Sequence, residues 1–162
     1  SPMMDIFTEA FDVEHLHLND LTPVRFDMEH ARICATVPCG KPTPIFSQVQ
    51  GKLLSEYLSR NPKMTFLFEV TGDSMVNAGI SAGDVVVVDC RMEAQHGNIV
   101  LAEVNGEITL KRLQMIPNKR TKMMDMALIP DNPRHPPVKL SDFDDVHIFG
   151  VATRKMRIEE LL

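Results

Sequence analysis

A serine and a lysine are the residues of this sequence best suited to do chemistry together. Ser74 lies in a Gly-Asp-Ser-Met run at 72–75, and Lys111 lies in a Leu-Lys-Arg-Leu run at 110–113. A serine hydroxyl becomes an effective nucleophile when a neighbouring base takes its proton, and lysine acts as that base only when burial or a nearby cation makes it neutral. The pair is our candidate active site, with Ser74 as nucleophile and Lys111 as general base.

Each of the two motifs also has an ordinary structural interpretation. Gly-Asp-Ser is common in turns, serine caps helices, and short motifs often match by chance. A strand lysine commonly points to solvent, and alternation places Lys111 on the strand face shared by Thr109 and Leu113 without showing that this face is buried. At pH 7 an ordinary lysine is neutral in only about one molecule in 2,500. We therefore hypothesise that residues 37–41 cover this face and exclude water.

Strand-like segments dominate the chain after residue 64 and would allow a sheet to bring Ser74 and Lys111 together. Alternating or β-branched runs predict strands at 65–71, 84–89, 98–104, 107–113, 127–130 and 146–153. Asn105-Gly106 between two of these runs is a strong hairpin signal. One short amphipathic helix is expected at 50–59. The sequence therefore predicts a mainly β fold with one short helix.

The charge is distributed unevenly along the 162 residues, whose formal net charge is −5. Residues 1–39 hold seven acidic and two basic residues, whereas residues 40–162 hold 15 of each. We therefore divide the chain into an acidic N-terminal arm, 1–39, and a β-rich domain, 40–162. The arm pattern leaves open a short amphipathic helix or an edge strand that docks on a partner, or a mobile segment.

Residues 37–44, with the sequence Val-Pro-Cys-Gly-Lys-Pro-Thr-Pro, connect the arm to the domain. The prolines favour an extended backbone, and Gly40 is the one unrestricted link among them. An extended segment with a small residue after the central bond suits a protease cleft. A plain linker is the commoner role of such a segment.

Cysteine usage and hydropathy indicate a cytoplasmic protein that does not enter a membrane. Cys34, Cys39 and Cys90 form no even disulfide framework, which suits a reducing compartment. The longest apolar run, Val85–Val88, has four residues, whereas a membrane span needs about 20. His30 could join Cys34 and Cys39 at a metal, but no fourth ligand is indicated. We expect no metal and no cofactor.

Seven short motifs follow one another between about residues 31 and 153: Val37-Pro38-Cys39-Gly40, Gly72-Asp73-Ser74-Met75, Gly79-Ile80-Ser81-Ala82-Gly83-Asp84, His96-Gly97-Asn98-Ile99-Val100, Thr109-Leu110-Lys111-Arg112-Leu113, Leu128-Ile129-Pro130 and Phe149-Gly150-Val151. With these motifs the sequence resembles the LexA/UmuD family of self-cleaving serine peptidases, which act in the SOS response to DNA damage. The resemblance implies a compact LexA/signal-peptidase-like β domain with an extended N-terminal arm. It also implies that Ser74 and Lys111 cut the chain's own Cys39–Gly40 bond.

The same resemblance implies partners. Self-cleavage would be stimulated by the RecA filament on single-stranded DNA, and the product would be a homodimeric accessory subunit of a UmuC-like Y-family polymerase in translesion synthesis. The arm is longer than is usual in the polymerase-accessory branch, which leaves its packing open.

Two alternatives remain: the protease half of a LexA-like repressor, and a non-catalytic interaction module of the same fold. Two bases in an acidic arm argue against sequence-specific DNA binding, because DNA binding relies on Lys and Arg at phosphates.

Overall fold

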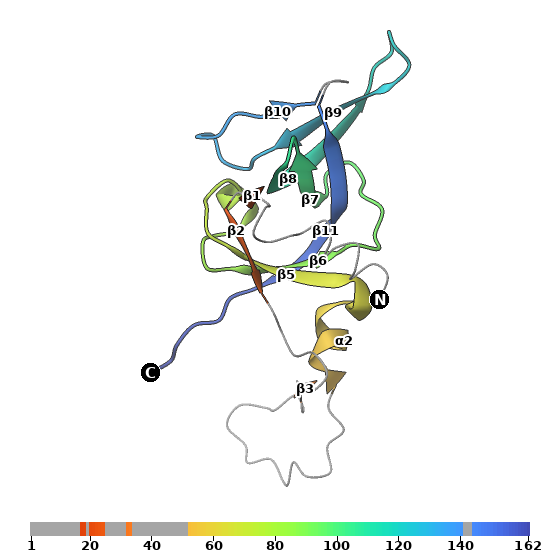
Figure 1. The fold of residues 1–162 in the computed structure, drawn as a ribbon. Helices are drawn as coiled ribbons and strands as arrows, with labels where there is room; N and C mark the ends of the chain where they lie inside the picture. Colours follow the sequence, from red (N-terminus) through yellow and green to blue (C-terminus); the bar gives the residue numbers. More distant parts are fainter. Residues whose placement is uncertain (1–16, 19, 25–31, 34–51, 141–143) are drawn as a thin grey trace.

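One curled β-sheet contains most of the elements in the computed structural model, which describes residues 17–18, 20–24, 32–33, 52–140 and 144–162 (Figure 1). The strands of this sheet are β1 (His17–Leu18), β2 (Leu21–Val24), β5 (Thr65–Val70), β6 (Val85–Asp89), β7 (Ile99–Val104), β8 (Glu107–Pro117), β9 (Met124–Ile129), β10 (Val138–Lys139) and β11 (Val146–Met156). They run in the order β10-β9-β8-β7-β11-β6-β5-β2, and β1 pairs with β8. The predicted mainly β fold is therefore confirmed.

The remaining elements are short. A two-stranded sheet joins β3 (Arg32–Ile33) to β4 (Lys52–Leu53), and helix α2 (Leu54–Leu58) follows directly. Two 3₁₀ helices, η2 (Pro62–Met64) and η3 (Val76–Ala78), precede and follow β5. Within the described ranges no helix is long and apolar enough to cross a membrane.

The predicted strands are all present. Their observed bounds differ from the predicted ones where strand pairing continues beyond the buried residues. β8 runs to Pro117 and β9 starts at Met124, because the two strands stay paired as far as these residues. The outer ends of both strands are exposed, so their residues do not show the alternation on which the sequence prediction relied. The helix expected at 50–59 is shorter, since Lys52 and Leu53 pair with β3 instead. The Asn105-Gly106 hairpin between β7 and β8 is confirmed, with both turn residues at positive φ.

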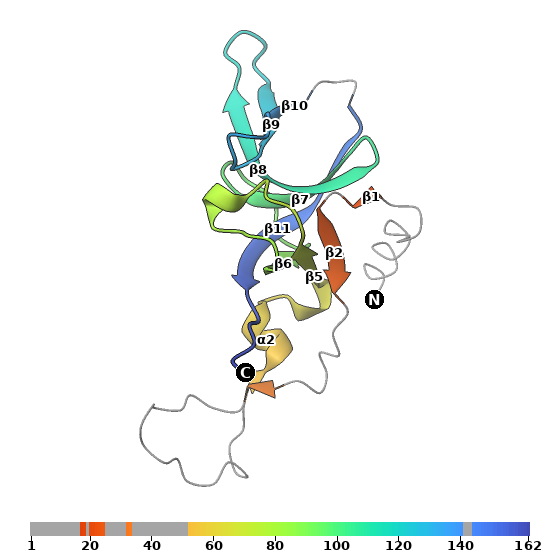
Figure 2. The same cartoon turned by 90° about the vertical axis from the view of Figure 1, so that its left-hand side faces the viewer.

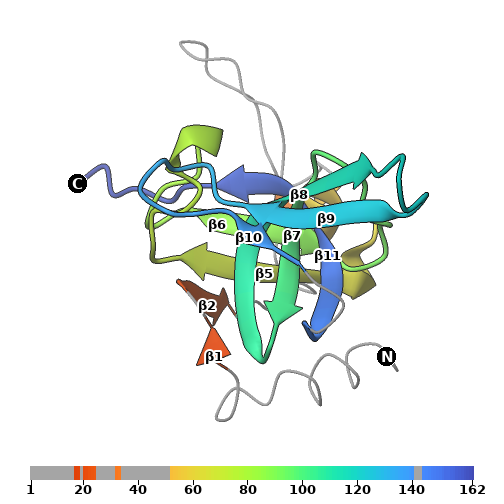
Figure 3. The ribbon, with the colours of Figure 1, turned by 90° about the horizontal axis from the view of Figure 1, so that it is seen from above.

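The sheet curls on itself, as Figure 3 shows. Hydrophobic side chains on both faces of β8 are buried. Leu110 packs with the larger cluster, which includes Phe68, Val86 and Leu101. Leu113, two positions beyond Lys111, packs with the cluster on the other face. Either face of this strand is therefore interior, which alternation alone did not indicate.

Part of the acidic arm belongs to the sheet. β2 pairs antiparallel with β5, with Leu21 opposite Val70, and Figure 2 shows it as the edge strand beside β5. Pro23 fits there because an edge strand tolerates a residue without an N–H. β1 pairs in parallel with the start of β8, with His17 opposite Glu107. Residues 17–18 and 21–24 therefore form edge strands, one of the structures left open for the arm, but they pair with the chain's own sheet and not with a partner.

Candidate active site

The fold brings Ser74 and Lys111 together from two separate segments. Ser74 lies in the turn between β5 and η3, and Lys111 lies in the middle of β8. The Ser74 Oγ and Lys111 Nζ atoms are 3.0 Å apart, within hydrogen-bond distance. The other two predicted site residues, Cys39 and Gly40, lie outside the described residues, as do residues 37–41.

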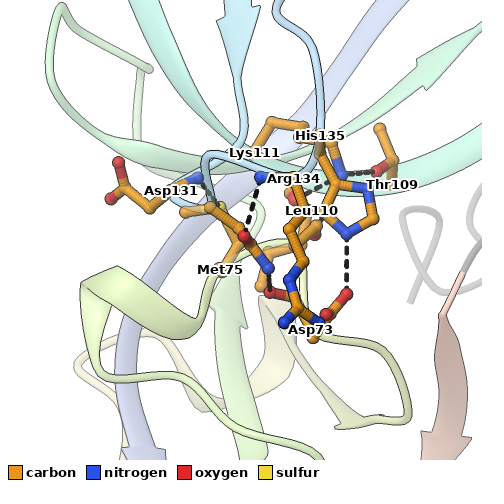
Figure 4. Close-up of polar contacts among 10 residues, drawn as sticks. Asp73, Met75, Thr109, Leu110, Lys111, Asp131, Arg134 and His135 are labelled. Carbon is orange, nitrogen blue, oxygen red and sulfur yellow. Dashed lines mark hydrogen bonds and ion pairs between the residues drawn. The ribbon is translucent and has the colours of Figure 1, made fainter.

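The lysine amine has three polar neighbours (Figure 4). Besides Ser74, Nζ lies 2.7 Å from Thr109 Oγ1 and 3.2 Å from the carbonyl oxygen of Leu110. A charged amine donates three hydrogen bonds, one to each neighbour. When it is neutral, Thr109 and Leu110 accept its two N–H bonds, and the lone pair is left to accept the proton of the Ser74 hydroxyl. The surroundings therefore suit the neutral amine as well as the charged one.

Burial lowers the pKa of Lys111 below its ordinary value of 10.5, because the charged form loses hydration. Only 9% of this residue is exposed. The negative charges of Asp20 and Glu107 act in the opposite direction and raise its pKa. The hypothesis that residues 37–41 provide the burial is untested, since they are not among the described residues.

The turn that carries Ser74 is anchored by its neighbours in the chain. Met75 is 2% exposed, and its side chain belongs to the larger hydrophobic cluster. Its carbonyl oxygen accepts hydrogen bonds from the N–H groups of Ala78, at 3.0 Å, and Ile80, at 3.2 Å. Ser74 itself is half-buried and directly precedes this fixed residue.

A loop after β9 contacts the same turn. The His135 Nε2 atom lies 2.7 Å from Asp73 Oδ1, and this hydrogen bond is the main reason that the pKa of Asp73 is lowered. Asn132 Nδ2 donates to the carbonyl oxygen of Asp73 at 2.9 Å. The sequence analysis missed these loop residues, because no local pattern links them to a turn about 60 positions earlier.

Sequence analysis placed Thr109 on the same strand face as Lys111 but did not predict its hydrogen bond to the amine, and it did not predict the effect of Asp20 on the lysine. The hydrogen bond of Thr109 could have been predicted, since this residue lies two positions before Lys111 on the same strand face and carries a hydroxyl. The effect of Asp20 could not have been predicted from local sequence, because Asp20 comes near Lys111 only when β2 pairs with β5.

Cys90 is a poor competing nucleophile. Burial raises the pKa of its thiol to about 12, so the reactive thiolate is scarce near neutral pH. Among the described residues, no three His, Cys, Asp or Glu side chains gather where they could hold a metal ion. His30, Cys34 and Cys39 fall outside those residues.

Comparisons with known proteins identify the family of this chain. A family model described as Peptidase S24-like matches residues 32–153, a range that includes both Ser74 and Lys111. Protein SamA of Salmonella typhimurium is 38% identical over 117 residues, which cover 72% of this chain and 76% of SamA. Protein ImpA of Escherichia coli is 35% identical over 115 residues, covering 70% of this chain and 74% of ImpA.

The LexA repressor of Oleidesulfovibrio alaskensis is 33% identical over 126 residues, covering 78% of this chain and 58% of the repressor. The matched range and the coverage of these relatives confirm the resemblance seen in the motifs. The chain belongs to the S24-like peptidases, the LexA/UmuD family of self-cleaving serine peptidases.

Proposed function

We propose that this protein cuts its own Cys39–Gly40 bond, with Ser74 as nucleophile and Lys111 as general base. The observation that carries the proposal is the 3.0 Å contact between Ser74 Oγ and the Nζ atom of a lysine whose pKa is lowered by burial. Membership of a serine peptidase family supports the same reaction class.

The chemistry follows from this pair. Neutral Lys111 takes the hydroxyl proton of Ser74 as Oγ bonds to the carbonyl carbon of Cys39. The N–H of Ser74 is a natural donor to the oxyanion that forms. The bond to the Gly40 nitrogen then breaks, that nitrogen takes the proton from Lys111, and an ester joins Ser74 to Cys39. Water hydrolyses the ester, restores the serine hydroxyl and releases the arm as a carboxylate.

A substrate segment in the same chain, or in the other chain of a dimer, removes the need for tight peptide binding. Intramolecular reaction provides an effective concentration that no free peptide reaches. A slow resting enzyme would then be activated by any protein that favours the docked segment. In this proposal that protein is the RecA filament on single-stranded DNA.

The proposed product is the accessory subunit of a Y-family translesion polymerase, acting as a homodimer. Charge supports a change in binding on cleavage, because residues 1–39 carry the whole formal charge of −5 and residues 40–162 carry equal numbers of acids and bases. Loss of the arm would also remove β2 from β5, and an uncovered strand edge pairs readily with another chain.

Intact-mass analysis of the purified full chain at alkaline pH tests the reaction. Wild-type protein should give two fragments, one beginning at Gly40. Ser74→Ala and Lys111→Ala should stay intact, whereas the matched surface variants Ser81→Ala and Lys139→Ala should be cut like wild type. A fragment boundary elsewhere, or cutting of Ser74→Ala at the wild-type rate, would contradict the proposal.

A pull-down tests the second half of the proposal. Self-cleaved wild-type protein and intact Ser74→Ala protein are compared for binding to a Y-family polymerase at two salt concentrations. Cleaved protein should bind more tightly. Equal binding by both forms at both concentrations would mean that cleavage does not control this interaction, and the non-catalytic interaction module would become the better description of the binding role.

A further inference from the structure

Asn132 is a buried polar residue whose amide hydrogen-bonds both to the turn that carries Ser74 and to its own loop. It is 7% exposed. Its Nδ2 atom donates to the carbonyl oxygen of Asp73 at 2.9 Å, and its Oδ1 atom accepts from the N–H of Arg134 at 3.0 Å. The position therefore requires a donor and an acceptor on one short side chain, which is what asparagine provides.

The carbonyl that Asn132 holds belongs to the peptide unit that joins Asp73 to Ser74. In a trans peptide the C=O and the N–H lie in one plane and point in opposite directions. The described residues contain no cis peptide bond. Fixing the carbonyl oxygen of Asp73 therefore also fixes the direction of the Ser74 N–H, which points away from Asn132.

The loop that carries Asn132 is itself tied to the strand of the lysine. Asp131 Oδ2 accepts hydrogen bonds from Arg112 Nε at 3.0 Å and from Arg112 Nη2 at 2.7 Å. Arg112 directly follows Lys111 on β8. Figure 4 shows Asp131 beside Met75, and the N–H of Asp131 lies 3.4 Å from Met75 Sδ. The loop therefore spans from the strand of Lys111 to the turn of Ser74.

We propose that Asn132 is a positioning residue for self-cleavage: its amide holds the Asp73–Ser74 peptide so that the Ser74 N–H faces the oxyanion formed at the cut bond. This inference rests on the proposed use of Ser74 and Lys111. It assigns Asn132 to the stabilisation of the intermediate and not to the titration of the lysine, because the Asn132 amide bonds to Asp73 and Arg134 and not to Lys111. The two roles predict different changes in a pH–rate profile.

The test compares pH–rate profiles of self-cleavage for wild type, Asn132→Ala and the matched control Asn118→Ala. Asn118 lies at the far end of the β8–β9 hairpin, where its amide also holds backbone groups, those of Arg120 and Thr121. Loss of a whole oxyanion donor costs about 10²–10³-fold in rate, so a misaligned donor should slow the plateau by about 10- to 100-fold. The midpoint pH should not move, and Asn118→Ala should keep the wild-type plateau.

Thermal unfolding of each variant confirms that it is folded at the assay temperature. If Asn132→Ala does not fold, Asn132→Ser is measured in its place, because it leaves a smaller gap and adds no charge. A wild-type plateau in a folded Asn132 variant would overturn the inference, and so would a shifted midpoint with an unchanged plateau.

Ser74→Ala and Lys111→Ala, measured alongside, separate this inference from the proposed function. If both are inactive while the Asn132 variant is fully active, only the role of Asn132 is wrong. If wild type does not cut itself, or Ser74→Ala cuts at the wild-type rate, the proposed function fails and the inference fails with it.

Discussion

The carboxyl group of Asp20 lies directly against the α-carbon of Gly72, so close that a methyl group on Gly72 would overlap it. The carbonyl oxygen of Asp20 also accepts a hydrogen bond from the N–H of Thr71 at 2.9 Å. An arm residue therefore contacts the segment that leads into Ser74. Its charge raises the pKa of Lys111, in opposition to the burial that lowers it.

Asp20→Asn should make the enzyme active at lower pH. Removing this negative charge removes a stabilisation of the charged lysine, so the pKa of Lys111 falls and more of the neutral base is present below the midpoint. A partly solvated charge should change the rate there by roughly twofold. Asparagine tolerates the positive φ of 61° at this position.

The measurement is the midpoint of the pH–rate profile for self-cleavage. Glu69→Gln is the control, since it neutralises an exposed carboxylate of β5 that does not act on the lysine. An unchanged midpoint in Asp20→Asn would show that the arm carboxylate does not influence the base.

Asp84 should contribute to stability through its charge. It is 1% exposed, accepts a hydrogen bond from the N–H of Ser81 at 2.9 Å, and pairs with Arg157 at 3.0 Å and Lys155 at 3.3 Å. The bond from Ser81 is the largest cause of its lowered pKa. Asp84→Asn should reduce the free energy of unfolding at pH 7 by about 1–3 kcal/mol.

The pH dependence follows from the direction of that shift. A carboxyl with a lowered pKa in the folded state stabilises the protein above its unfolded value of 3.8, and this contribution is lost as the pH falls through the lower, folded value. Urea unfolding of wild type and Asp84→Asn should therefore differ at pH 7, and the difference should shrink as the pH falls below 3.8. Asp145→Asn is the exposed control. A constant difference across that range would contradict the charge-based account.

Gly150 should not tolerate a side chain. A Cβ atom there would lie 2.6 Å from the carbonyl oxygen of Asp89 and 2.9 Å from the α-carbon of Cys90, and neither backbone atom can move freely. The pairing of β11 with β7 also shifts register between Ile148 and Gly150. Gly150→Ala should cost about 1–3 kcal/mol in unfolding free energy.

Gly106→Ala is the comparison for Gly150→Ala. A Cβ atom on Gly106 would meet no neighbouring atom, but the backbone there has a φ of 86°. This variant therefore isolates the cost of left-handed backbone strain, about 1–2 kcal/mol. A Gly150→Ala variant with wild-type stability would show that β11 and the end of β6 separate easily at Gly150.

Gly40→Glu should block self-cleavage without unfolding the domain. Glycine presents no side chain to a cleft wall, whereas glutamate adds bulk and charge beside the reacting carbonyl. Intact-mass analysis after incubation at alkaline pH gives the result, with the exposed surface variant Lys139→Ala as the control. Normal cutting of Gly40→Glu would place the scissile bond elsewhere in the chain.

The sequence predicted the strands and the Ser74–Lys111 pair because each has a local signal. Strand β6 is a β-branched run, the hairpin at Asn105 has its turn residues, and the candidate pair is recognisable by residue type and motif. What it did not predict depends on contacts between distant residues. Asp20 reaches Gly72 only after β2 pairs with β5, and Asn132 reaches Asp73 only through a loop with no periodicity.

The burial of Lys111 also could not be predicted from sequence patterns. Alternation separates the two faces of β8 but does not say that the curled sheet encloses both of them.

The pH–rate profile of self-cleavage tests the central claim, that Lys111 acts as a neutral base on Ser74, most directly. The rate of appearance of the fragment beginning at Gly40 is measured for wild type, Ser74→Ala and Lys111→Ala from pH 6 to pH 11. Because burial lowers the pKa of Lys111, the wild-type rate should rise about tenfold per pH unit and level off below pH 10.5, while both variants stay uncut. A flat wild-type profile, or cutting of Lys111→Ala at the wild-type rate, would contradict it.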